Sequence, residues 1–199
     1  MSKLNLKILG ASRGGLPCSE RVGGRQRMFK SYQCWINMLA RCYSDKWKEK
    51  QPTYKGCSVC PEWLQYPNFK RFYDKHFRVG FQLDKDILVE DNKVYSPENC
   101  RFVPVIINNL LTHIHHDKGE CPVGVSKRDR SNPYQAQISI KGKSIYLGTF
   151  KTMPLAYDAY KTAKESYIKG LAGDYYKRGE ITLDVYEALM AYKVTDKLP

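Results

Sequence analysis

The alternation of apolar and polar residues between Tyr134 and Ile140 constrains the fold more than any other feature of the sequence. Apolar side chains recur at every second position, and the polar side chains of Gln135, Gln137 and Ser139 lie between them. This period is typical of a strand that buries one face and exposes the other. The sequence therefore predicts a sheet whose free face is polar.

The residues around this strand predict the rest of a small sheet-and-helix unit. We expect a short strand at Val123–Val125, a tight turn at Lys141–Lys143 and a returning strand at Ser144–Phe150. Thr152 is a suitable N-cap for a helix that we expect to end near Gly170. Small and aromatic residues form one stripe along this helix: Ala156, Ala159, Tyr160, Ala163 and Tyr167. Together these elements predict a three-stranded antiparallel sheet packed on one helix.

Helical spacing dominates the first half of the chain. It predicts one helix over 31–43 and another over Glu62–Phe77, in which Pro67 either interrupts the helix or marks its start. The polar stretch Lys46–Tyr54 is expected to be a loop.

Strand patterns and further helices follow. We expect short strands at Phe81–Leu83 and Arg101–Val103, and a helix over Pro104–Leu111, because proline suits a first helical position. The polar residues 112–120 are expected to be a linker, and 180–192 a last short helix.

The expected fold class is therefore α+β, in four segments. A basic flexible arm is expected over 1–30, and a domain of helices followed by two strands and a helix over 31–116. The sheet-and-helix unit is expected over 120–175, and a C-terminal helix and tail over 180–199.

The balance of charge points to a polyanionic partner. The chain has 33 Lys and Arg against 20 Asp and Glu, a net charge of +13, and neutralising phosphates releases counterions. No apolar run approaches the ~18 residues of a spanning helix, and Met1–Gly10 is too short and broken for a signal peptide. These features favour a nucleic acid over a membrane, although a merely basic solvated surface would give the same charge.

The seven cysteines are an odd number in a chain without a secretion signal, which indicates reduced thiols in the cytoplasm. Cys57 and Cys60 have the spacing of half a zinc site, but no second pair follows at a suitable distance. Structural zinc is therefore not expected, and buried thiols are the alternative.

The predicted sheet carries side chains suited to double-stranded DNA. Arg and Lys pair with guanine or phosphate, and Gln can pair with adenine, so a sheet face with these residues could read the major groove. The candidates on the free face and at the hairpin ends are Lys127, Arg128, Arg130, Gln135, Gln137, Ser139, Lys141 and Lys143. A solvated sheet face on a basic protein would look similar.

Four segments of this region resemble the Apetala/ethylene-response-factor domain, which is also found appended to phage nucleases: Pro122–Val125, Tyr134–Ile138, Tyr146–Thr152 and Ala156–Tyr160. The resemblance implies that the sheet, not the helix, enters the major groove. It adds Tyr146 to the expected DNA contacts. The tryptophans of the plant pattern are absent, so no sequence preference is implied.

A second set of residues resembles the HNH endonucleases: Leu83–Asp86, Ser96–Val103 and Asn108, with a lead-in that begins near Trp35. The resemblance implies a ββα-metal core in which Asp84 and Asn108 bind one divalent ion, Mg²⁺ or Mn²⁺, and Asn99 braces the loop. Without the resemblance, Asp84 would read as a turn residue and Asn108 as a helix-surface residue.

This chain departs from that family at one catalytic position. A histidine that acts as general base should follow the aspartate, and Lys85 stands there instead. A lysine is protonated near neutral pH and suits phosphate binding better than proton abstraction. His76, His113, His115 and His116 are candidate replacements, and ordinary linker or phosphate-neighbouring histidines are the alternative.

The sequence thus predicts a site-specific DNA endonuclease of the free-standing phage homing type, which hydrolyses phosphodiesters with a metal ion in the cytoplasm of a bacterial host. The rival prediction is a DNA-binding protein that does not cut, such as a regulator or a site-occupying inhibitor. An RNA- or protein-binding module is a third class with no positive feature in the sequence.

Overall fold

The computed structural model describes residues 6–7, 9–111 and 121–194. It is a mixed helix-and-sheet fold, which confirms the α+β class. The chain divides into two compact units, unit 1 over Met1–Asn108 and unit 2 over Asn109–Pro199. The expected linker, with His113, His115 and His116, lies outside the described residues.

Unit 1 begins with helices around an aromatic core. Its helices are α1 (Lys30–Tyr43), α2 (Asp45–Lys50) and α3 (Tyr66–His76), with short 3₁₀ turns at Pro52–Tyr54 and Pro61–Leu64. The helix expected over 31–43 is confirmed. The pattern over Glu62–Phe77 divides at Gln65, and Pro67 lies in the first turn of α3, where its missing N–H costs nothing.

The core of unit 1 is unusually rich in large aromatic side chains. Trp35, Trp63, Tyr66 and Phe69 are all 0–1% exposed. The indole Nε1 of Trp35 donates to the carbonyl oxygen of Trp63 at 2.7 Å, so this buried polar atom is satisfied. This contact fixes α1 against the segment that leads into α3.

Two predictions for the first half of the chain are wrong. The expected loop at Lys46–Tyr54 contains α2, whose good helix formers outweigh its polar character. Asp45 in the first turn and Lys48 in the last match the helix dipole. The expected flexible arm contains an antiparallel hairpin, β1 (Ser19–Val22) with β2 (Arg25–Met28).

Two strands and a helix complete unit 1. Strand β4 (Phe81–Asp84) pairs antiparallel with β6 (Arg101–Pro104), and α4 (Val105–Leu111) follows β6 directly. The N–H of Val105 donates to the carbonyl of Gly80 at 2.9 Å, which ties α4 to the start of β4. The connection between β4 and β6 contains β5 (Val94–Tyr95), which pairs parallel with β3 (Ser58–Val59).

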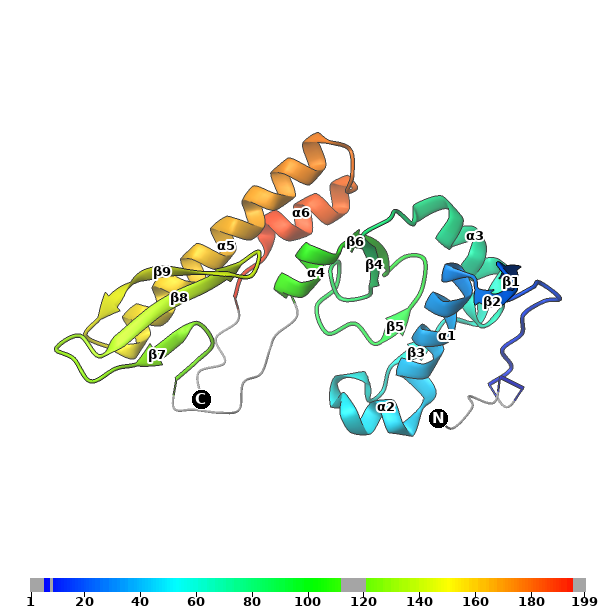
Figure 1. Cartoon of the computed structure of the whole chain (residues 1–199), viewed down its shortest axis with the longest axis horizontal. Helices are drawn as coiled ribbons and strands as arrows, with labels where there is room; N and C mark the ends of the chain where they lie inside the picture. The colour runs from blue at the N-terminus through cyan, green and yellow to red at the C-terminus, as the bar shows by residue number, and fades with distance from the viewer. Residues whose placement is uncertain (1–5, 8, 112–120, 195–199) are drawn as a thin grey trace. The chain divides into compact units, whose positions relative to one another are not determined.

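Unit 2 is a three-stranded antiparallel sheet covered on one face by a long helix (Figure 1). The strands are β7 (Val125–Lys127), β8 (Tyr134–Ile140) and β9 (Lys143–Phe150), in that order, and the helices are α5 (Met153–Lys177) and α6 (Leu183–Ala191). Ile138 of β8 is buried against Tyr157 and Tyr160 of α5. The predicted burial of alternate residues in β8 is confirmed.

Three boundaries in unit 2 differ from the prediction. The first strand begins at Val125, not Val123, because Gly124 has a φ of +81° and turns the chain. Helix α5 continues past Gly170, which is exposed, and buries Ala172 before it ends at Lys177. The C-terminal helix α6 packs on α5 and so belongs to unit 2.

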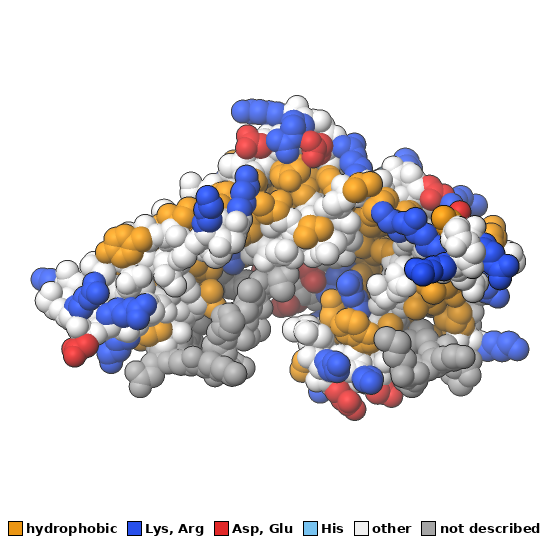
Figure 2. Space-filling view, viewed as in Figure 1, with side chains coloured by type: hydrophobic (Ala, Val, Ile, Leu, Met, Phe, Trp, Pro, Cys, Tyr) orange, Lys and Arg blue, Asp and Glu red, His pale blue; other side chains and the backbone are white. Residues whose placement is uncertain are grey.

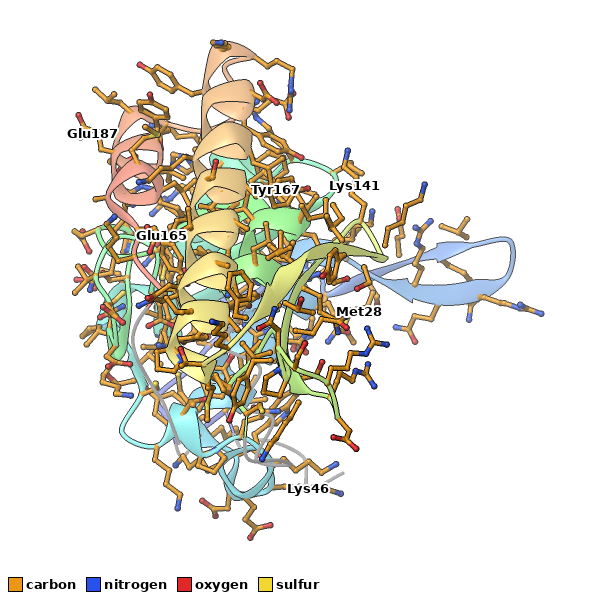
Figure 3. The ribbon with its side chains drawn as sticks, turned by 90° about the vertical axis from the view of Figure 1, so that its left-hand side faces the viewer. Met28, Lys46, Lys141, Glu165, Tyr167 and Glu187 are labelled. Carbon is orange, nitrogen blue, oxygen red and sulfur yellow. The ribbon has the colours of Figure 1, made fainter. Side chains whose placement is uncertain are left out.

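The segment after α6 is held against α5. The carboxylate of Glu165, labelled in Figure 3, accepts hydrogen bonds from the Nζ of Lys193 and the N–H of Val194, both at 3.0 Å.

Among the helices that the structure describes, none has the length and apolar character needed to cross a membrane.

Candidate functional site

A cavity of about 380 Å³ in unit 1 brings several predicted site residues together. Asp84 and Lys85 line it from the end of β4, and Asn108 lines it from α4. Helix α1 contributes the polar residues Lys30, Gln33, Asn37 and Arg41, together with Cys34 and Met38. Residues that are far apart in sequence therefore line one cavity, which has both polar and apolar side chains.

The carboxylate of Asp84 organises the loop after β4. Its Oδ1 accepts hydrogen bonds from the N–H groups of Asp86 at 2.8 Å and of Ile87 at 2.7 Å. Its Oδ2 accepts none from the residues that the structure describes. Burial raises the pKa of Asp84 above its ordinary value, and the neighbouring Asp86 carboxylate adds to this, against the effect of the two hydrogen bonds.

The raised pKa of Asp84 predicts how cation binding depends on pH. Without a cation, the buried carboxylate of Asp84 destabilises the folded protein when it is ionised. This loss of stability is complete once the pH has risen through the pKa of Asp84 in the folded state. A divalent cation offsets that loss and competes with the proton. We therefore expect Mn²⁺ affinity, measured by calorimetry, to fall on acidification at a higher pH than an ordinary aspartate would give. An affinity independent of pH down to the ordinary range of aspartate would contradict this.

Lys85, which directly follows Asp84, is 6% exposed. Its ammonium donates to the Oδ1 of Asp86 at 2.5 Å and to the carbonyl of Asn92 at 2.6 Å. A buried ammonium held by two acceptors is not available as a proton acceptor. The sequence suggested that Lys85 contacts phosphate. Its two hydrogen bonds instead favour a role in stabilising the loop after β4.

Asn92 is a bracing residue that sequence reasoning missed. Its Nδ2 donates to the carbonyls of Lys85 and Val94, both at 2.8 Å, and its Oδ1 accepts from the N–H of Val94 at 3.0 Å. Asn99, the expected brace, reaches the Oδ1 of Asn92 at 3.3 Å. Both asparagines therefore brace the loop, but Asn92 bonds the backbone of Lys85 and Val94, whereas Asn99 bonds the side chain of Asn92. Its position in a turn-like Asp-Asn pair gave no sign of its burial.

Asn108 is oriented by strand β4. Its Nδ2 donates to the Oε1 of Gln82 at 2.8 Å, and Gln82 lies two residues before Asp84 on the same strand. The bond engages the amide nitrogen, which is not a metal ligand. The oxygen is the atom of this group that suits a hard cation.

Arg41 is the second residue that sequence reasoning did not assign to the site. Its guanidinium lies over the ring of Tyr54, 5.8 Å from the centroid, and close to the side chain of Tyr95. Burial opposes its charge, but Tyr95 and Tyr54 outweigh burial and raise the pKa of Arg41. It makes no ion pair with any carboxylate of the described residues. The cavity thus contains a permanent cation that no described carboxylate pairs with.

Among the described candidates for a base or a metal ligand, His76, Cys57 and Cys60 do not line this cavity. His76 is exposed, and its ring lies 4.5 Å from that of Phe72. Partial desolvation of the ring, with the nearby charges of Lys75 and Arg101, lowers its pKa. Cys57 and Cys60 are free thiols. Within the described ranges, no three His, Cys, Asp or Glu side chains are arranged to hold a metal ion.

The sheet of unit 2 divides its residues as the alternation predicts. Gln135, Gln137 and Ser139 follow the register that faces away from α5, opposite the buried Ala136 and Ile138. A bulge pairs Gln137 with Tyr146, which is 60% exposed and lies on the same face. This free face therefore combines amide, hydroxyl and aromatic groups.

The cationic candidates lie around that face rather than on it. Lys127 and Lys143 pair with inward-facing residues, Tyr134 and Ile140, but both are exposed at strand ends. The others, Arg128, Arg130 and Lys141, are exposed in the loops that join the strands. Figure 3 labels Lys141 in the turn, and Figure 2 shows Lys and Arg side chains over the region of the loop from β7 to β8.

Comparison of the chain with protein-family models, with curated proteins and with solved structures finds no match.

Proposed function

We propose that this chain is a metal-dependent DNA endonuclease, in which the sheet of unit 2 reads a duplex and the cavity of unit 1 acts on its phosphodiester backbone. The observation that carries the proposal is the cavity itself. Asp84, Asn108, several polar residues of α1 and Arg41, which pairs with no described carboxylate, line one space.

The ligand set suits a hard divalent cation such as Mg²⁺ or Mn²⁺. Asp84 offers a carboxylate oxygen, Oδ2, that accepts no bond from the described residues, and Asn108, whose amide also contains an oxygen, lines the same cavity. A bound ion would neutralise charge on the phosphate and on the leaving oxygen. The antiparallel pair β4 and β6, followed by α4, supports an HNH-like reading of this region.

Arg41 would supply a second positive charge to a bound phosphodiester. The ring of Tyr54 and the side chain of Tyr95 lie against its guanidinium, which is charged at any pH near neutrality. An arginine held in this way loses little side-chain entropy when it binds a phosphate oxygen. Gln33 and Asn37, which hydrogen-bond each other at 2.8 Å along α1, would supply further backbone contacts.

One observation favours the rival function, a DNA-binding protein that does not cut. Lys85 replaces the expected base and is already held by Asp86 and Asn92. No histidine of the described residues lines the cavity. In this reading unit 1 would hold the phosphate backbone, and unit 2 would select the site.

Selection from a randomised duplex library, followed by footprinting in Ca²⁺ and incubation in Mg²⁺ or Mn²⁺, tests both functions. Cleavage within the footprint supports the endonuclease. A sequence-specific footprint that stays uncut in both metals supports the non-cutting protein. The absence of any footprint would refute both functions.

The free sheet face gives a prediction of its own. Gln137→Ala and Arg128→Ala should each cost about 1–3 kcal/mol at the selected duplex, because a base edge loses its partner. Binding is measured by fluorescence anisotropy on the selected and on an unrelated duplex. Lys177→Ala, an exposed cation at the end of α5, is the matched control. Equal losses on both duplexes would mean phosphate contact without base reading.

A further inference from the structure

The hairpin of β1 and β2 is exposed along nearly its whole length. Every residue of Glu20–Met28 is exposed, and only Ser19 is partly covered. The turn residues Gly23 and Gly24 both have positive φ, +56° and +77°, which suits the tight turn of a two-residue hairpin. Figure 3, where Met28 is labelled, shows the hairpin extending away from the other elements of unit 1.

This hairpin has no partner in its own unit. It is a two-stranded sheet by itself, and among the described residues no further strand pairs with either edge. Two-stranded hairpins are marginally stable alone in water. This one also leaves Val22 49% and Met28 46% exposed. Such an element gains stability when a partner covers it.

Its charge identifies the chemistry of that partner. The hairpin carries Arg21, Arg25 and Arg27 against one acid, Glu20. None of the four makes an ion pair with another described residue. The excess of unpaired arginine fits a polyanion.

The register distributes the arginines over both faces of the ribbon. Arg21 pairs with Gln26, and these residues share one face. Arg25 pairs with Val22 and Arg27 with Glu20 on the other face. A ligand that contacts only one flat face would leave one set of arginines unused. A ligand with two anionic walls would use both.

We propose that the β1–β2 hairpin is a second DNA-binding element, which inserts turn-first into the major groove. This groove is about 12 Å wide, admits a two-stranded ribbon and has a phosphate wall on each side. The two faces of the hairpin then meet the two walls, and Arg25 and Gln26, next to the turn, lie closest to the base edges. The inference rests on the proposed function in one respect, that the chain binds duplex DNA.

The test compares two triple variants of the full chain that lose the same charge from the same unit. One carries Arg21→Gln, Arg25→Gln and Arg27→Gln, and the control carries Lys46→Gln, Lys48→Gln and Lys50→Gln on α2. Affinity for the selected duplex is measured in Ca²⁺ over a range of salt, with protection of guanine N7 from methylation. Because each phosphate contact contributes about 0.9 to the salt slope, the hairpin variant should lose roughly 2–3 from it and bind at least about tenfold more weakly.

The outcomes separate this inference from the proposed function. If the wild type binds, and both variants keep its salt slope and N7 protection, the hairpin is not a DNA contact and the proposed function stands. If the atom whose protection from methylation depends on the hairpin is adenine N3 and not guanine N7, the hairpin binds the minor groove. That result would overturn the inference. If the wild type fails to bind duplex DNA, both proposals fail. Thermal unfolding checks that each variant is folded, and single Arg→Gln variants replace the triple if it is not.

Discussion

Asp84→Asn is expected to lower metal-dependent strand cleavage by at least about 100-fold while DNA binding is retained. Loss of a residue that hydrogen-bonds a metal ligand lowers metal affinity or activity by about 10–100-fold. Loss of a direct ligand should therefore lower the cleavage rate at least as much. Asparagine keeps an oxygen that can accept the bonds from Asp86 and Ile87, so the loop after β4 is preserved. The charge that attracts the cation is removed. The measurement is the single-turnover cleavage rate on the footprinted duplex in Mg²⁺ and Mn²⁺.

Two controls make this prediction specific. Asp74→Asn removes an exposed carboxylate of α3 that pairs with Lys70, and it should leave cleavage and metal affinity unchanged. Calorimetry with Mn²⁺ tests the site even if the wild type does not cut, because Asp84→Asn should then still lose affinity. Full cleavage and full Mn²⁺ affinity in Asp84→Asn would remove the cavity from the proposed chemistry.

Gly124→Ala is expected to destabilise unit 2 by about 3 kcal/mol or more. A Cβ at this position would lie 2.1 Å from Cδ2 of Tyr160, and the φ of +81° is unfavourable for any residue with a side chain. Tyr160 cannot easily give way, because it is 7% exposed and packs with Ile138 and Tyr157 beneath the sheet. The substitution therefore opposes the packing of α5 on the sheet.

The measurement must report on unit 2 alone. All three tryptophans, Trp35, Trp47 and Trp63, lie in unit 1, so their fluorescence should be unchanged in this variant. Hydrogen exchange of β8 and α5 reads unit 2 directly, and should accelerate strongly.

Gly142→Ala is the matched control. Its φ of +77° is similar, but a Cβ there would meet no atom within 4 Å. It should therefore cost only about 1 kcal/mol from backbone strain. Similar exchange in both variants would mean that the contact with Tyr160 does not hold the unit together. A loss of DNA binding confined to Gly124→Ala would link the sheet to recognition.

The sequence by itself determined the elements whose signals are local. The alternation in β8 and the helical spacing of α1 each repeat over a short stretch, and the structure has both. It also singled out Asp84 and Asn108, which the structure brings to one cavity. The predictions for β8 and α1 succeeded because burial of one face imposes a period that can be read without knowing the partner. The metal-binding role of Asp84 and Asn108 came from a family resemblance and stays a prediction.

Only the tertiary structure decided what depends on partners distant in sequence. Lys85 is buried and bonded to Asp86 and Asn92, so it is not a free cation. Arg41 lines the same cavity as Asp84. The exposed hairpin of β1 and β2 likewise replaces the expected arm. Side-chain burial and charge pairing are set by which elements meet in space, and residue types along the chain do not carry that information.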